Sequence, residues 1–170
     1  MTEPIRDKII RSIRAADDLY YHLVLLVGES GSGKTRVLRE VAEDMGISVI
    51  NLNLTLSGEL IELTARQRSL RLPGFLDQIA DRSPAPVLLD NIEILFDSDL
   101  KHDPLRLLQG ISRKRAVVAA WNGTSTGRKI SYAEPGHSEY RSYDTVDALI
   151  VRMDGTASVD SLNNLQRGST

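Results

Sequence analysis

The sequence contains no cysteine among its 170 residues. This absence excludes disulfide-stapled scaffolds, cysteine-ligated zinc, iron–sulfur clusters and thiol nucleophiles, and it is typical of a reducing compartment. Long hydrophobic runs are absent as well, because the longest, residues 23–27, is far shorter than the ~20 apolar residues that span a membrane. Residues 1–7 also lack the basic and then apolar layout of a signal peptide. We therefore expect a cytoplasmic protein with no membrane partner.

The sequence also has little excess charge of either sign. Its 21 basic and 23 acidic side chains leave a net charge of −2, and its pI is about 5.9. Domains that bind nucleic acid through a broad basic surface usually have a pI above ~9, so the composition does not indicate DNA binding, although a local patch would suffice. The hydrophobic and charged shares, 41% and 26%, are those of a soluble globular protein. The length predicts one domain, which we assign to residues 1–153, with a polar and loosely held tail at 154–170.

Short apolar segments alternate with amphipathic ones along most of the chain. This alternation predicts an α/β fold with a central, mostly parallel five-stranded sheet, helices on both faces and a small β-hairpin insertion. The usual helical lid is not expected, because too few residues follow the last strand. We expect strands at 22–27, 47–52, 87–90, 116–121 and 148–153, and hairpin arms at 130–132 and 139–143. We expect helices at 5–20, 34–45, 59–65, 75–80 and from 104. Between them we expect a loop at 53–58, a break at Pro73-Gly74 and a turn at 122–124.

A glycine-rich motif follows the first expected strand and opens a helix. Gly28-Glu29-Ser30-Gly31-Ser32-Gly33-Lys34-Thr35 matches the P-loop pattern G-x-x-x-x-G-K-[ST] at every position. The glycines allow backbone N–H groups to converge as an anion nest, and the helix N-terminus adds donors and partial positive charge. An ordinary glycine-rich turn before a helix is the alternative.

The motif assigns nucleotide ligands to individual residues. Lys34 is expected to reach the β- and γ-phosphates of ATP, and the Thr35 hydroxyl is expected to bind Mg²⁺. The preceding loop residues and Arg36 complete the expected cofactor-binding set. ATP and Mg²⁺ are therefore the expected cofactors.

An acidic residue ends the third expected strand. Asp90 after Val-Leu-Leu fits a Walker B pattern and would hold Mg²⁺ directly or through water. The alternative is that Asp90 caps the next segment. Many ATPases of this class place a glutamate directly after that aspartate, but here the position is Asn91, which cannot take a proton. Glu93 would replace it as the catalytic group if the chain turns helical after Asp90; otherwise it is a surface residue.

The fourth expected strand ends at a polar residue. If this strand lies between the strands that carry the P-loop and Asp90, Asn122 points at the γ-phosphate and senses it or the attacking water. Thr124 is the fallback for that role. The alternative is that Asn122-Gly123 is only a turn dipeptide.

Several arginines have either a functional or a structural interpretation. Arg66, Arg68 and Arg71 would contact nucleic acid or a partner, or else form a solvated helix face. Arg141 is a candidate arginine finger for a neighbouring subunit, although the tyrosine-rich hairpin around it better fits a protein–protein surface.

Two further stretches carry a specific resemblance. The first is the run 88–97, followed by Asp-Pro-Leu-Arg-Leu-Leu-Gln at 103–109, Ser-Arg at 112–113 and Trp-Asn-Gly at 121–123. The second is Tyr-Ala-Glu-Pro-Gly-His-Ser-Glu-Tyr at 132–140. Both resemble the BrxF family of small P-loop proteins. That family belongs to the type 3 BREX (bacteriophage exclusion) anti-phage systems. The resemblance covers about residues 20–145. It implies an AAA-type ATP-binding core that acts beside other BREX proteins, among them a methyltransferase and a helicase, and it implies that Asn91 is a family feature compatible with limited hydrolysis.

The leading functional hypothesis is a slowly hydrolysing ATP-binding subunit of such a defence complex, acting as a nucleotide-dependent switch or assembly factor. Without a lid, a neighbouring copy would complete the site, so we expect a homo-oligomer. A DNA-dependent AAA loader is an alternative. A small-molecule kinase is another, with Arg106, Arg113 and Arg115 as its only lid candidates, which we do not expect to close over the nucleotide.

Overall fold

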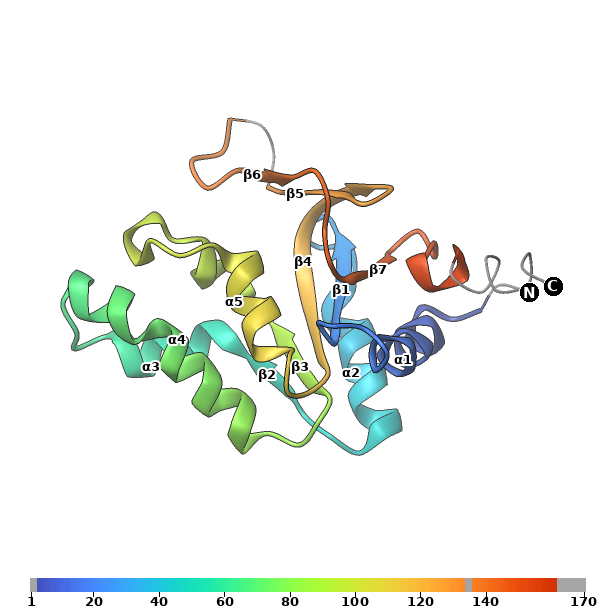
Figure 1. The fold of residues 1–170 in the computed structure, drawn as a ribbon, viewed down its shortest axis with the longest axis horizontal. Coiled ribbons are helices and arrows are strands. Elements are labelled where there is room, and N and C mark those ends of the chain that lie inside the picture. Colours follow the sequence, from blue (N-terminus) through green and yellow to red (C-terminus); the bar gives the residue numbers. More distant parts are fainter. Residues whose placement is uncertain (1–2, 134–135, 162–170) are drawn as a thin grey trace.

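The computed structural model describes residues 3–133 and 136–161. Its centre is a sheet of five parallel strands in the order β2-β3-β4-β1-β7 (Figure 1). Strand β4 lies between β1, which leads into the P-loop, and β3, which ends at Asp90, as the interpretation of Asn122 requires. The strands are β1 (Leu23–Gly28), β2 (Val49–Asn51), β3 (Val87–Asp90), β4 (Val117–Thr126), β5 (Lys129–Tyr132), β6 (Arg141–Tyr143) and β7 (Leu149–Arg152).

Helices cover both faces of this sheet, which explains why its central strands are apolar throughout. In Figure 1, α1 and α2 lie on one side of the sheet, and α3, α4 and α5 lie on the other. Two separate apolar clusters result, one under each helical layer. The helices are α1 (Ile5–Ala16), α2 (Lys34–Met45), α3 (Leu52–Leu60), α4 (Ala65–Arg82) and α5 (Pro104–Ile111), with short 3-10 helices η1 (Ile92–Phe96) and η2 (Ser98–Leu100).

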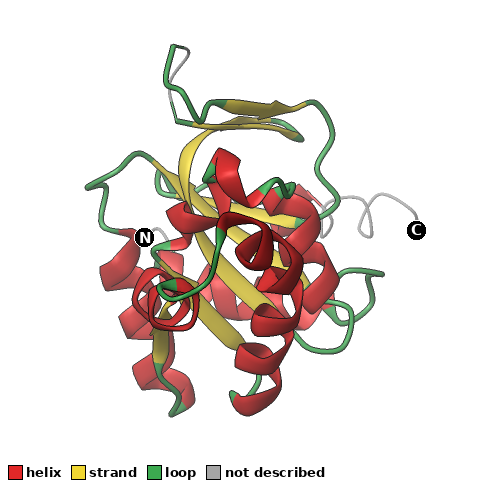
Figure 2. Cartoon of the chain, turned by 90° about the vertical axis from the view of Figure 1, so that its left-hand side faces the viewer, coloured by secondary structure: helices red, strands yellow, loops and turns green. Residues whose placement is uncertain are grey.

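Strand β4 is longer than expected and carries the inserted hairpin. The residues 122–124, expected as a turn, continue the strand, and β4, β5 and β6 form an antiparallel ribbon that rises above the parallel sheet (Figure 2). The close approach of β5 explains Gly123, because a Cβ at this position would lie 1.7 Å from the Ser131 carbonyl oxygen. We name residues 122–132 and 141–143 the ribbon.

The segment between β2 and β3 differs most from expectation. The expected loop 53–58 is helical, because α3 begins at Leu52, ends at Leu60 and buries Leu52, Leu56 and Leu60 on one face. Polar residues between these leucines hide the spacing in the sequence. The expected break at Pro73-Gly74 is also absent, since α4 runs through it from Ala65 to Arg82.

A side chain from another element compensates for the proline inside α4. Pro73 has no N–H, so the carbonyl of Ser69, four residues earlier, loses its partner within the helix. His102 supplies the missing donor, because its Nε2 lies 2.6 Å from the Ser69 oxygen. The helix therefore continues through Pro73 with this carbonyl satisfied.

The part of the expected tail that the structure describes packs on the core. Ala157 and Val159 are buried, and Asp160 accepts hydrogen bonds from Lys8 and Arg11 of α1. Loose attachment is therefore wrong for residues 154–161, while 162–170 lie outside the described residues. No helical lid follows β7 in the described part, and no described helix is both long and apolar enough to span a membrane.

Candidate functional site

The P-loop connects the carboxyl end of β1 to the first turn of α2. Gly31 and Gly33 have φ values of 80° and 100°, a region that disfavours residues with a Cβ. Gly33 caps α2, which begins at Lys34 and ends at Met45 as the sequence predicts, with Gly46 as its C-terminal cap. The loop therefore places the unpaired N–H groups of a helix N-terminus at the carboxyl edge of the sheet, where parallel α/β proteins bind ligands.

Lys34 is drawn in over the loop rather than extended into solvent. Only 6% of the residue is exposed, and its ammonium donates to the carbonyl oxygens of Gly28 at 2.9 Å and Glu29 at 2.6 Å. Burial lowers the pKa of Lys34, and the nearby carboxylates of Glu93 and Asp90 oppose that shift. A phosphate is a charged and therefore stronger acceptor than these carbonyls, so the ammonium is placed to exchange them for phosphate oxygens.

Thr35 and Asp90 meet across the site. The Thr35 hydroxyl donates to Oδ2 of Asp90 at 2.6 Å, and only 8% of the Asp90 residue is exposed. Its other oxygen accepts the N–H of Asn91 at 2.9 Å, so Asp90 does help to start the next segment as well as facing the P-loop. A hydroxyl and a carboxylate side by side are hard oxygen donors that fit Mg²⁺. The described residues contain no cluster of three or more His, Asp or Glu able to hold a metal alone.

A left-handed residue turns the chain back toward the site after Asp90. Asn91 has φ 55° and ψ 53°, a conformation that asparagine tolerates better than most residues. Its carbonyl accepts the N–H of Asn53 at 3.1 Å, which holds the bend. The 3-10 helix η1 follows, so the chain does turn helical and brings Glu93 back beside the phosphate loop.

Glu93 and Asn122 are joined directly. The side-chain amide of Asn122 donates to Oε1 of Glu93 at 2.5 Å. Asn122 also lies beside Gly28 in the register of β1 and β4, which places it at the mouth of the P-loop. The turn interpretation of Asn122 is therefore wrong, while Thr124 lies farther along the ribbon and faces another hollow.

One hollow of about 440 Å³ collects most of the expected site residues. Lys34, Thr35, Asp90, Glu93 and Asn122 line it, together with Ser30, Gly31, Gly33 and Arg36. Glu29 lines the neighbouring hollow instead, and Gly28 and Ser32 support the loop. Arg39 also lines the hollow and was not foreseen, although its place three residues after Arg36 on α2 puts both on one helix face.

Two of the other candidate arginines, Arg68 and Arg141, have structural partners. Arg68 donates to three carbonyl oxygens at the end of α3, which favours its structural interpretation over nucleic-acid contact. Arg141 donates to the His102 carbonyl at 3.4 Å.

The arginines expected as the only lid candidates of a kinase lie away from the P-loop. Arg113 stacks on Tyr20, Arg115 bonds the Ile111 carbonyl and Asp81, and Arg106 lies 4.0 Å from Asp103. Arg113 and Arg115 lie before β4, at the opposite edge of the sheet from the P-loop.

Comparison with known proteins agrees with this geometry. A family model described as "ATPase family associated with various cellular activities (AAA)" matches residues 24–120, more than half of the chain. Neither the curated proteins nor the solved structures contain a match. The matched segment begins in β1, ends in β4 and includes both the P-loop and Asp90. The chain belongs to the AAA family of P-loop nucleotide-binding ATPases.

Proposed function

We propose that this AAA protein is an ATP- and Mg²⁺-dependent switch that hydrolyses ATP slowly and serves in a BREX-type anti-phage defence complex. The observation that carries the switch is the hydrogen bond from Asn122 to Glu93. It joins the candidate catalytic carboxylate to the strand that continues into the ribbon. A change at the phosphate hollow would therefore reach a protruding surface through one residue.

In this proposal the P-loop holds the phosphates. Its N–H groups and Lys34 would bind the phosphate oxygens. Thr35 and Asp90, which are hydrogen-bonded to each other, are the residues that would hold Mg²⁺, and the ion would supply charge neutralisation to the phosphates. All of these groups lie at one edge of the sheet, and binding requires Lys34 and Thr35 to exchange their present hydrogen-bond partners for ligands.

Hydrolysis then needs a base for the attacking water. Asp90 and Glu93 are the carboxylates among the described residues that line the phosphate hollow. Asp90 already accepts hydrogen bonds from Thr35 and from the Asn91 N–H, which leaves Glu93 for this role. It accepts a proton from the water as oxygen attacks the γ-phosphorus and the bond to ADP breaks, which yields ADP and phosphate. While the Asn122 amide occupies Oε1, that oxygen is not free to accept a proton from water, so turnover is slow until a partner draws the amide away.

The ribbon is the output of the switch. The Asn122 carbonyl accepts the N–H of Ala133 at 3.2 Å, so the backbone of this residue is tied to the end of β5. Movement of Asn122 toward a phosphate would displace this end of the ribbon. A neighbouring copy or another defence protein reads the displacement.

The defence role rests on the resemblance to the BrxF family. Its two most specific stretches, 88–97 and 132–140, lie far apart in the sequence, yet Phe96 of the first stacks on Tyr132 of the second with ring centroids 3.4 Å apart. The two stretches therefore pack against each other in the fold. On this resemblance the protein would act beside other BREX proteins, and the absence of a lid among the described residues is the reason to expect a homo-oligomer.

Three experiments test this proposal. Phosphate release should be slow for the purified chain and should fall to background in Glu93→Gln, and sedimentation velocity with ATP·Mg²⁺ should show a larger species than without nucleotide. In cells that carry the complete BREX gene set, Lys34→Ala should restore phage plating. Full restriction of phage by Lys34→Ala would contradict a role of the switch in defence. A monomer both with and without ATP·Mg²⁺ would contradict the homo-oligomer.

A further inference from the structure

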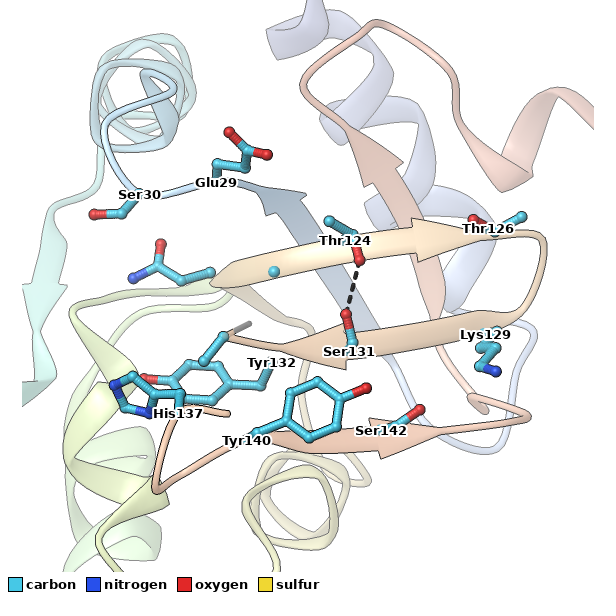
Figure 3. A pocket seen from close by; sticks show the side chains of 13 residues that line it. Glu29, Ser30, Thr124, Thr126, Lys129, Ser131, Tyr132, His137, Tyr140 and Ser142 are labelled. Carbon is cyan, nitrogen blue, oxygen red and sulfur yellow. Dashed lines mark hydrogen bonds between the residues drawn. The ribbon is translucent and has the colours of Figure 1, made fainter. Parts of the chain in front are cut away.

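A second and larger hollow lies next to the phosphate hollow. Its volume is about 930 Å³, near the upper end of the usual range for small-molecule sites. Figure 3 shows it over one face of the ribbon, with Glu29 and Ser30 of the P-loop at its border. Among their lining residues the two hollows share Ser30 and Asn122. The space is therefore continuous with the phosphate site but is built mainly from the ribbon.

The floor of this hollow is a row of hydroxyl groups. Thr124, Ser131 and Ser142 lie directly opposite one another on β4, β5 and β6. The hydroxyls of Thr124 and Ser131 are 2.7 Å apart, as the dashed line in Figure 3 marks. The ribbon's other face buries Ile130 and packs Tyr143 against Trp121, because side chains alternate along a strand. The apolar face of the ribbon packs on the rest of the protein. That packing does not explain the three aligned hydroxyls on the face that lines the hollow.

The two ends of the row differ in chemistry. Lys129 lies near the turn between β4 and β5, while Tyr140 and His137 lie toward the other end (Figure 3). Tyr140 is 39% exposed, and its ring borders the hollow beside Ser142. A cation, a hydroxyl row and an open aromatic ring thus lie in sequence across one surface.

We propose that this hollow binds a nucleotide unit of single-stranded nucleic acid. Lysine, serine and threonine side chains are common phosphate and sugar ligands, so Lys129 and the hydroxyl row hold the backbone. An exposed tyrosine ring is a stacking platform for a base, which is the place of Tyr140. A free mononucleotide shares this chemistry and is the other possible source.

The charge of the protein limits how such a strand is held. Among the described lining residues, Lys129 carries the positive charge and Glu29 a negative one. The Lys129 ammonium also lies 4.0 Å from the exposed carboxylate of Asp144, which a phosphate would have to replace as its partner. Each phosphate neutralised on a single strand contributes about −0.7 to the slope of log K against log salt. We expect a slope near −1 or shallower, in contrast to the steep dependence of a broad basic groove.

Asn122 would couple this hollow to the ATP site. It borders both hollows and holds Glu93. A strand that contacts Asn122 would compete for its amide and free the carboxylate. This coupling rests on the proposed function, whereas binding of the strand does not.

The test is fluorescence anisotropy of fluorescein-labelled dT12 with the full chain. We expect binding to weaken at least about fivefold in Tyr140→Ala, the low end for loss of one stacked base, and also in Lys129→Gln. Matched controls are Tyr20→Ala and Lys114→Gln, an exposed tyrosine and lysine outside the hollow, which should bind as wild type. Unchanged ATP affinity by calorimetry shows that each variant is folded.

The outcomes separate the possibilities. In one outcome, dTMP displaces dT12 from the wild type at a similar concentration of nucleotides but does not do so in Tyr140→Ala. This outcome supports the same site with the mononucleotide as its ligand. No binding of either probe, or equal binding to wild type, Tyr140→Ala and Lys129→Gln, overturns the proposal. Lys34→Ala distinguishes the two sites: dT12 binding that persists when ATP binding is lost shows that the hollow binds independently of the proposed nucleotide function.

Discussion

Asn122 on β4 and Glu93 on η1 are 29 residues apart in the sequence, and a hydrogen bond from the asparagine amide joins them at the edge of the P-loop. Two features bring them together. Parallel pairing of β3 with β4 sets their strand ends side by side, and the left-handed Asn91 returns the chain toward the site. The pair links the candidate catalytic group to the ribbon.

Replacement of Lys34 by alanine should weaken ATP binding by about 30- to 150-fold, or about 2–3 kcal/mol, because a charged hydrogen bond to phosphate is lost. Isothermal titration with ATP·Mg²⁺ measures this change. Lys114→Ala, which removes an exposed lysine after α5, is the matched control and should bind ATP normally. Wild-type affinity in Lys34→Ala would contradict the phosphate site.

Glu93→Gln should lower the turnover number by about 10²-fold or more and leave ATP affinity close to wild type, since general-base catalysis contributes about 10²–10⁴. The amide keeps the shape of the side chain but takes no proton. A phosphate-release assay gives turnover, and Glu62→Gln, at an exposed position after α3, serves as the control. Undiminished turnover in Glu93→Gln would mean that another group activates the water.

Gly123→Ala should destabilise the fold by about 1–3 kcal/mol, the usual cost of overpacking. The new methyl group would lie 1.7 Å from the Ser131 carbonyl oxygen, which is backbone and cannot swing aside. Gly110→Ala in α5 is a matched control, since nothing lies within 4 Å of its Cβ, and it should be neutral or stabilise by about 0.5–1 kcal/mol. Urea unfolding measures both variants; equal stability would show that β5 does not pack as described.

His102 should matter only while Pro73 is present. In the wild type, His102→Ala leaves the Ser69 carbonyl without its donor and should cost about 1 kcal/mol. In a Pro73→Ala background the helix supplies its own N–H, so the same replacement should cost less. A double-mutant cycle by urea unfolding gives the coupling. Additive effects would show that His102 does not compensate for the proline.

The free energy of unfolding should fall as pH rises above about 10. Burial raises the pKa of both Tyr132 and Tyr143, and a hydrogen bond to Asp103 raises that of Tyr143 further. A raised folded-state pKa favours the protonated form, so this stability is complete below the unfolded value near 10 and is lost at higher pH. Trp121 contacts both rings and reports unfolding by fluorescence.

The matched variants make the alkaline effect specific. The double replacement Tyr132→Phe and Tyr143→Phe should lose less stability between pH 8 and pH 10.5 than the wild type, because neither ring then ionises. Tyr20→Phe alters an exposed tyrosine and should behave as wild type. Identical pH dependence in all three proteins would exclude the two buried hydroxyls as its source.

Much of the nucleotide site was predictable because it is local. The P-loop lies within eight consecutive residues, and the strand, glycines and helix around it each carry their own signal, so α2 has the bounds that the sequence predicts. Asp90 likewise ends an apolar run. The parallel sheet followed from its buried strands, since only strands covered on both faces are apolar throughout.

The elements that were predicted wrongly depend on distant partners. Helix α3 exists because Leu52, Leu56 and Leu60, spaced four residues apart, pack into the core. Helix α4 passes Pro73 because His102, from another segment, donates to the Ser69 carbonyl. Residues 154–161 pack because Asp160 meets two basic side chains of α1. No local pattern reveals such contacts.

Local chemistry alone specified that a phosphate-binding loop and an acidic strand end stand at one edge of an α/β sheet, because short-range backbone preferences and hydrophobic spacing encode both. The three-dimensional arrangement settled which strand lies between them, that Glu93 faces Asn122, and that a hydroxyl-lined hollow opens beside the loop. These outcomes require strand order and long-range packing, which arise only when segments distant in the chain come into contact.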